Sequence, residues 1–202
     1  MTDDSWLVVG LGNPGPGYAS NRHNVGQMAL AELAHRVGVS SQSSATFKSH
    51  KANATVAEAR LSPGGPKLIL AKPNSFMNLS GGPVAQLLRF YDLDASQLIV
   101  LHDELDIPFD TVRIKSGGGH GGHNGIRDIA AAIGTPDFVR VRIGIGRPPG
   151  RQDAADFVLK PFTGAEREVL PSLLSDAVDA TELVIIEGLL AAQTRFHAPR
   201  PE

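Results

Sequence analysis

The sequence predicts a single α/β domain in which a twisted mixed β-sheet is flanked by helices. Short apolar stretches end in glycine or polar turn residues, and segments with helical spacing of apolar residues lie between them. Buried strands that alternate with helices are typical of an α/β sheet. Apolar side chains make up 42% of the 202 residues, which is enough for a sizeable core. No repeat or change of composition marks a boundary, so we expect one domain over residues 1–202.

The first half of the chain contains four expected strands and two expected helices. The strands are expected at residues 6–11, 55–61, 67–71 and 97–101, the last of which is nearly all apolar. Apolar residues recur at helical spacing over residues 24–37, and Gly38 supplies a stop signal. A second helix is expected to open at residues 80–83, because Pro83 suits a first helical turn.

The second half continues the alternation. Strands are expected at residues 111–115 and 139–146, with a helix over 126–133 between them. A helical segment is expected over about 163–196, since Thr163 and Glu166 have the spacing of a capping box. Pro171 is expected to kink or restart this helix. We expect residues 198–202 to fray.

Composition excludes several classes of function. The chain has no cysteine, so disulfides, thiolate metal sites and cysteine nucleophiles are all excluded. The residues Met1-Thr2-Asp3-Asp4 lack a secretion signal, and no run approaches the ~18 apolar residues of a membrane span. We therefore expect a cytoplasmic protein without membrane attachment.

The charges are unevenly distributed. The formal net charge is −2, yet residues 111–151 contain seven Lys or Arg and only two Asp. A local basic zone is compatible with a phosphate-bearing partner. Ordinary solvated charges that do not cluster in space explain the same pattern about equally well.

A glycine motif at the end of the first strand resembles a dinucleotide fingerprint. Residues 10–15 read Gly-Leu-Gly-Asn-Pro-Gly, but the fingerprint also requires a helix to open immediately after it. Here Pro14 and Pro16 flank Gly15, and the helical pattern starts several residues later. Dinucleotide binding is therefore disfavoured.

One histidine and one aspartate form the candidate catalytic pair. Imidazole can take and return protons near neutrality, which makes His23 a candidate base. A histidine at a helix start is more often a cap or a surface residue, so it needs an acidic partner. Asp103 follows the buried strand at 97–101, where catalytic groups of α/β sheets are found, although it could equally be a turn residue.

Two loops supply further polar groups. Residues 117–125 are rich in glycine, which allows close approach of a ligand or simply a flexible loop. His120 and His123 in this loop bring no third ligand of obvious spacing, so we expect no metal. No Gly-x-Ser-x-Gly elbow exists in the chain, so water activated by His23 is a better nucleophile candidate than Ser75 or Ser80.

Several motifs in sequence order resemble the bacterial type of peptidyl-tRNA hydrolase. The matching segments are residues 9–15, Tyr18, residues 21–24, 76–81, 102–106, 117–125 and 142–148. Each is modest evidence, but their occurrence in this order is highly specific. The chain after Gly150 matches only loosely.

The resemblance implies a monomer that needs no metal or nucleotide cofactor. It implies hydrolysis of the ester between a peptide and the 3′-terminal ribose of tRNA, which recycles tRNA released prematurely by ribosomes. In that family the counterpart of His23 is the base, that of Asp103 orients it, and that of Asn13 helps to distinguish peptidyl from aminoacyl substrates. No covalent intermediate is expected.

The same resemblance suggests which other residues meet the substrate, the acceptor arm of tRNA and the nascent peptide. The residues expected to line the site are Tyr18, Phe76, Met77, Asn78, Gly121, His123 and Asn124. The side chains expected to meet tRNA phosphates are Arg113, Lys115, Arg140 and Arg142.

Two alternatives from other classes stay open at this point. A non-catalytic RNA-binding relative with the same fold would keep the basic zone and lose the base. The presence of both His23 and Asp103 argues against it. A dinucleotide-dependent oxidoreductase would retain NAD(P) on purification.

Overall fold

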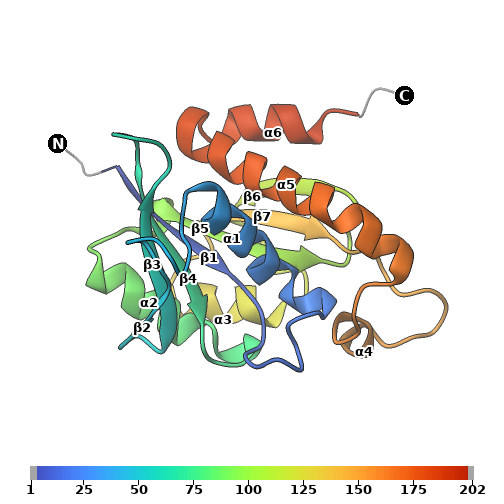
Figure 1. The fold of residues 1–202 in the computed structure, drawn as a ribbon. Helices are drawn as coiled ribbons and strands as arrows, with labels where there is room; N and C mark the ends of the chain where they lie inside the picture. Colours follow the sequence, from blue (N-terminus) through green and yellow to red (C-terminus); the bar gives the residue numbers. More distant parts are fainter. Residues whose placement is uncertain (1–3, 200–202) are drawn as a thin grey trace.

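The computed structural model describes residues 4–199, and a seven-stranded mixed sheet runs through it (Figure 1). The strand order is β2-β3-β4-β1-β5-β7-β6. The strands are β1 (Ser5–Gly10), β2 (Lys48–His50), β3 (Ala54–Arg60), β4 (Lys67–Pro73), β5 (Leu98–Glu104), β6 (Val112–Ser116) and β7 (Val139–Gly144).

The centre of the sheet is parallel and its edges are antiparallel. β1 pairs in parallel with β4 and β5, and β5 pairs in parallel with β7. Gly10 at the end of β1 lies opposite Leu101 of β5, so β5 extends three residues beyond the end of β1, to Glu104. Central parallel strands are buried on both faces, which explains why residues 6–9 of β1 and 98–101 of β5 are all apolar.

Helices cover both faces of the sheet (Figure 1). The α-helices are α1 (Val25–Arg36), α2 (Gly81–Phe90), α3 (Asn124–Ile133), α4 (Ala154–Val158), α5 (Gly164–Glu187) and α6 (Leu189–His197). Alternate side chains of β1 face opposite cores. Val8 belongs to the core that contains residues of α1 and α5, whereas Leu7 and Val9 belong to the core that contains residues of α2 and α3. α6 lies against the edge strand β6.

The predicted fold class is confirmed, but several details differ. β2 is a short strand of polar residues, and α4 has only five residues; neither was predicted. α5 runs without interruption through Pro171, so the expected restart there is wrong, and the helical segment divides at Gly188 instead. The expected fraying of residues 198–202 falls mostly on residues outside the described range. Between residues 4 and 199 no helix combines the length and hydropathy needed to cross a bilayer.

Candidate active site

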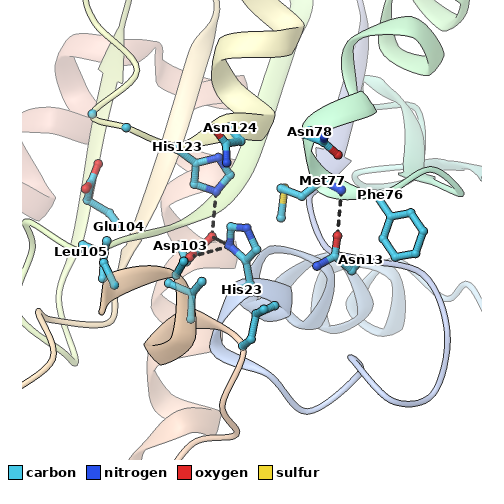
Figure 2. Close-up of a pocket in the computed structure, with 16 residues that line it drawn as sticks. Asn13, His23, Phe76, Met77, Asn78, Asp103, Glu104, Leu105, His123 and Asn124 are labelled. Atoms are coloured by element: carbon cyan, nitrogen blue, oxygen red, sulfur yellow. Dashed lines mark hydrogen bonds and ion pairs between the residues drawn. The ribbon is translucent and has the colours of Figure 1, made fainter. Parts of the chain in front are cut away.

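The predicted catalytic residues meet at the carboxyl ends of β1 and β5 (Figure 2). Asp103 lies on β5, and His23 lies in a 3₁₀ turn (Arg22–Asn24) that leads directly into α1. A glycine allows α1 to approach this closely. A Cβ at Gly26 would lie 2.1 Å from the Leu101 carbonyl oxygen, so any side chain there would push α1 and His23 away from β5.

His23 and Asp103 form a hydrogen-bonded pair. The Nδ1 atom of His23 lies 3.0 and 2.9 Å from the two carboxylate oxygens of Asp103. Because a carboxylate accepts, Nδ1 carries the proton, and the neutral imidazole keeps a free electron pair on Nε2. Burial lowers the pKa of His23, but the neighbouring Asp103 charge outweighs burial, so the pKa is raised above its ordinary value.

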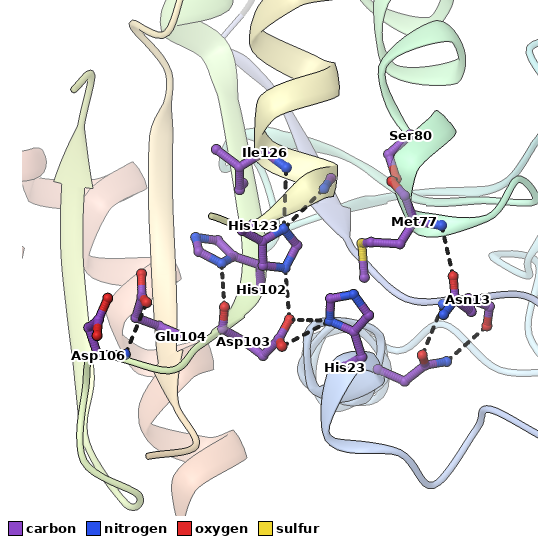
Figure 3. Close-up of polar contacts among 12 residues, drawn as sticks. Asn13, His23, Met77, Ser80, His102, Asp103, Glu104, Asp106, His123 and Ile126 are labelled. Carbon is purple, nitrogen blue, oxygen red and sulfur yellow. Dashed lines mark hydrogen bonds and ion pairs between the residues drawn. The ribbon is translucent and has the colours of Figure 1, made fainter. Parts of the chain in front are cut away.

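A second histidine holds the same carboxylate from the other side (Figure 3). His123 precedes α3, and its Nδ1 accepts hydrogen bonds from the backbone N–H groups of Gly125 and Ile126, at 3.2 and 3.3 Å. The proton of a neutral His123 is therefore on Nε2, which donates to Asp103 at 2.8 Å. Burial alone would raise the pKa of Asp103, yet the two histidines hold that pKa far below its usual range.

A third histidine lies behind this cluster. The His102 side chain is buried, and its Nδ1 donates to the Asp103 carbonyl oxygen at 2.7 Å. Its ring contacts that of His123, with centroids 4.8 Å apart. Burial lowers the pKa of His102 well below the ordinary value, so this imidazole stays neutral.

Asn13 is held in one orientation. Its backbone N–H donates to Asn24 Oδ1, and Asn24 Nδ2 donates back to the Asn13 carbonyl, both at 2.9 Å. The side-chain Oδ1 of Asn13 accepts from the Met77 N–H at 2.8 Å. Because Oδ1 is occupied, the amide presents N–H donors from Nδ2 to the neighbouring cavity.

A cavity of about 420 Å³ lies over these groups. It is lined by Asn13, His23, Phe76, Met77, Asn78, Asp103, Glu104, Leu105, Gly121, Gly122, His123, Asn124, Ala154, Ala155, Val158 and Leu159. Most of the residues expected to bind substrate are thus brought together. Tyr18 is the exception, since it contacts the ring of Phe76 edge-on, with centroids 6.0 Å apart, and does not itself line the cavity.

Sequence reasoning missed one wall of this cavity. Ala154, Ala155, Val158 and Leu159 come from α4 and the residue after it. A sequence signal was present, because Asp153 caps this helix by accepting from the Ala155 N–H and apolar residues follow it. Glu104 and Leu105, directly after Asp103, were also missed.

Arg140 lies in the interior of the protein. The residue is only 1% exposed, which leaves little of it open to the phosphate contact expected from the sequence. The guanidinium donates to the carbonyl oxygens of Gly118, Gly119 and Pro136, at 3.2, 2.7 and 3.0 Å, and lies over the ring of Phe138. Arg140 therefore anchors the glycine loop that carries His123 and Asn124.

The other three basic residues are half-buried on the same face of β6 and β7. Arg113 and Arg142 lie opposite each other in the strand register. Arg113 donates to the Phe196 carbonyl and Lys115 to the Gly119 carbonyl, at 2.7 and 3.0 Å. The Arg142 Nε is buried without a partner in the described part of the chain. Arg142 and Lys115 remain candidates for phosphate contact.

The structure also assembles a set of groups that could hold a metal. The ligand atoms of His23, Asp103 and His123 lie within 4.8 Å of one another, which the sequence spacing did not reveal. As bonded here, both imidazole nitrogens that face Asp103 carry protons, and the other His123 nitrogen accepts from backbone amides. This arrangement suits proton transfer better than metal ligation, which requires free electron pairs.

Comparisons with known proteins agree on one family. The family model described as peptidyl-tRNA hydrolase matches residues 7–202. The peptidyl-tRNA hydrolase of Leifsonia xyli subsp. xyli is 66% identical over 192 residues, covering 95% of this chain and 96% of the relative. That of Arthrobacter sp. (strain FB24) is 60% identical over 194 residues, covering 96% and 97%. The crystal structure of peptidyl-tRNA hydrolase from Acinetobacter baumannii superposes with a TM-score of 0.87 at 33% identity, covering 100% of this chain and 99% of that one.

Proposed function

The chain belongs to the peptidyl-tRNA hydrolase family and hydrolyses peptidyl-tRNA, and we propose that it does so with water activated by His23. The observation that carries this mechanism is the His23–Asp103 pair at the cavity, which leaves the Nε2 electron pair free. The described residues that line the cavity include no hydroxyl or thiol side chain. In this proposal water is the nucleophile and no covalent intermediate forms, because the Nε2 atom of His23 can accept a proton from water.

The proton follows a simple path in this mechanism. Nε2 of His23 accepts a proton from water as the oxygen attacks the ester carbonyl. The imidazolium that forms is stabilised by the Asp103 carboxylate, which stays ionised because its pKa is held so low. The same proton then passes to the 3′-terminal ribose oxygen as the ester bond breaks, which returns His23 to its neutral form.

Amide groups stabilise the charge that develops on the carbonyl oxygen. Asn13 presents N–H donors, and Asn78 and Asn124 line the same cavity. Removing one such donor costs about 3–4 kcal/mol of transition-state stabilisation where it has been measured. The amides that do not face the oxyanion can pair with the peptide backbone of the substrate. We assign this second role to Asn13, which would then distinguish a peptidyl from an aminoacyl group.

The tRNA is placed by charge at the edge of the cavity. Lys115 donates to the Gly119 carbonyl of the glycine loop, and Arg142 lies on the neighbouring strand β7. Both offer cationic groups to phosphates of the acceptor arm. We propose that the enzyme acts as a monomer. We also propose that it works in the cytoplasm, where peptidyl-tRNA is formed.

The proposed function is tested by what the enzyme cleaves and what it spares. N-acetyl-aminoacyl-tRNA carries a neutral amide, whereas the α-nitrogen of aminoacyl-tRNA is a charged ammonium for which the three asparagines offer no carboxylate. We expect rapid hydrolysis of the first and little of the second, a difference that Asn13→Ala erodes. Sites built around a polar group can reject an analogue by ~10⁴–10⁵.

A matched control is Asn74→Ala, because Asn74 bonds to the Thr55 hydroxyl and does not line the cavity. It should leave the discrimination unchanged. Equal rates on the two substrates would refute the specificity claim. Absence of hydrolysis of either would favour the non-catalytic RNA-binding alternative.

A further inference from the structure

Arg22, the residue before His23, is buried and does not line the cavity. Its side chain is 5% exposed. Nη1 donates to the carbonyl oxygens of Phe157 and Lys160, both at 3.4 Å, and Nη2 donates to Glu166 at 2.8 Å. The guanidinium carbon also lies 4.1 Å from the centre of the Phe157 ring. One side chain therefore contacts α4, the residues after it and the first turn of α5.

The main chain makes the same connection. The Arg22 N–H donates to the Lys160 carbonyl at 3.0 Å, and Asn21 forms an isolated antiparallel bridge with Pro161. The segment that carries the catalytic base is thus joined directly to the segment that follows α4. Figure 1 shows α4 beside the blue turn that precedes α1.

The segment fixed in this way is the apolar wall of the cavity. Four of the lining residues belong to it: Ala154, Ala155, Val158 and Leu159. A helix of five residues is too short to be stable alone, so the position of α4 depends on its contacts. In the described structure, Asn21 and Arg22 join the segment that carries His23 to this wall, through hydrogen bonds from Arg22 to the Phe157 and Lys160 carbonyls and through the bridge between Asn21 and Pro161.

We propose that Arg22 is a positioning residue that sets how closely the α4 wall approaches His23, and thereby how tightly the acyl group of the substrate is bound. This proposal rests on the proposed function, since it places the acyl group in the cavity. Arginine suits the task because its planar fork can bond two carbonyls and one carboxylate together. Lysine would keep the charge but lose the fork.

The test compares Arg22→Lys with Arg36→Lys. Arg36 also joins a helix, α1, to α5, through hydrogen bonds to Asp179 and Ser175. It is exposed, and it does not line the cavity. With N-acetyl-phenylalanyl-tRNA, Arg22→Lys should raise KM about tenfold, the discrimination that one misplaced apolar contact gives. The kcat should change less than threefold, because the His23–Asp103 pair is retained. Arg36→Lys should leave both constants unchanged.

Amide hydrogen exchange supplies a second readout. Residues 154–160 should exchange faster in Arg22→Lys than in Arg36→Lys, whereas exchange in β5 should match between them. A merely structural role for Arg22 would lower the melting temperature and the active fraction without a change in KM. Unchanged KM and exchange in a folded variant would overturn the proposal, and so would a loss confined to kcat.

Glu166→Gln tests the positioning role of Arg22 if Arg22→Lys does not fold. It keeps Arg22 and an amide oxygen that can accept from the Thr163 N–H, but removes the charge that holds Nη2. We expect a smaller rise in KM and faster exchange over residues 154–160, and absence of both would overturn the proposal. Wild-type protein that fails to hydrolyse this substrate would instead refute the proposed function.

Discussion

The Nδ1–H of His23 faces both carboxylate oxygens of Asp103, at 3.0 and 2.9 Å. This double contact fixes the plane of the imidazole as well as its tautomer. The ring can therefore neither turn its free nitrogen away from the cavity nor lose its proton to the wrong atom. Asp103 thus sets both the pKa and the orientation of the His23 imidazole. Substitution of His23 removes the base itself, whereas substitution of Asp103 changes only the properties of that base.

We predict that His23→Ala lowers kcat by about 10²–10⁴-fold, the usual contribution of general-base catalysis. Affinity for tRNA should survive, because phosphate contacts come from other residues. Single-turnover rates and a binding titration measure the two effects separately. His35→Ala, at an exposed position of α1, is the control. A variant that retained more than a tenth of the rate would assign the base to another residue.

We predict that the acid limb of kcat/KM lies above the ordinary imidazole pKa, because the pKa of His23 is raised and its neutral form is the base. In Asp103→Asn the charge that raises this pKa is gone while burial remains. The limb should then move to lower pH, with a reduced maximum. A pH–rate profile of both proteins decides this, and a limb that stays in place would contradict the assignment.

We predict that Lys115→Gln combined with Arg142→Gln raises KM and flattens its dependence on salt. Each lost phosphate contact should reduce the logarithmic salt slope by about 0.7–0.9. Arg140→Gln should behave differently, because Arg140 holds the glycine loop and is shielded from solvent. It should lower activity at every salt concentration. An unchanged slope in the double variant would mean that these two side chains do not meet phosphates.

We predict that activity resists a chelator selective for transition metals, such as 1,10-phenanthroline, at fixed magnesium so that the tRNA stays folded. The nitrogens of His23 and His123 that face Asp103 are hydrogen-bond donors in this structure, which leaves them no electron pair for a metal. Complete loss of activity that zinc restores would overturn the metal-free mechanism.

We predict that His102 makes the protein less stable in acid. Burial lowers the pKa of His102 in the folded state. When the pH falls below ~6.5, the pKa of histidine in the unfolded chain, the unfolded chain takes up a proton that the folded protein does not, so the free energy of unfolding decreases. Asparagine can keep the hydrogen bond to the Asp103 carbonyl. The stability of wild type relative to His102→Asn should fall by about 1 kcal/mol between pH 7.5 and 5.5. Urea unfolding at the two pH values measures it, and a constant difference would contradict burial of a neutral His102.

Local patterns predicted the sheet because its central strands contain short apolar runs or, in β7, apolar residues at alternate positions. β2 escaped prediction because Lys48, Ser49 and His50 have no apolar period, and its place depends on pairing with β3. The long helix at Gly164–Glu187 was predicted as helical, but its passage through Pro171 depends on packing that the sequence pattern does not contain.

The candidate site likewise contains residues that the sequence could predict and residues that only the folded structure reveals. Residue chemistry and strand position made His23 and Asp103 candidates, and the motif resemblance added Asn13; the structure brings the three together. The sequence could not reveal that His123 bonds to Asp103, or that Arg140 turns inward, because both depend on how distant loops meet in space. The α4 wall lies in the part of the chain where the resemblance is loose, so only the fold identified it.

The contact between Arg22 and Phe157 joins residues 135 positions apart. During synthesis His23 and Asp103 emerge from the ribosome well before the wall that completes their cavity. A nascent chain of this protein, still esterified to tRNA, belongs to the class of molecule that the finished enzyme cleaves. The late arrival of α4 keeps such a chain from acquiring the complete site until residues near 160 have been added and released from the exit tunnel.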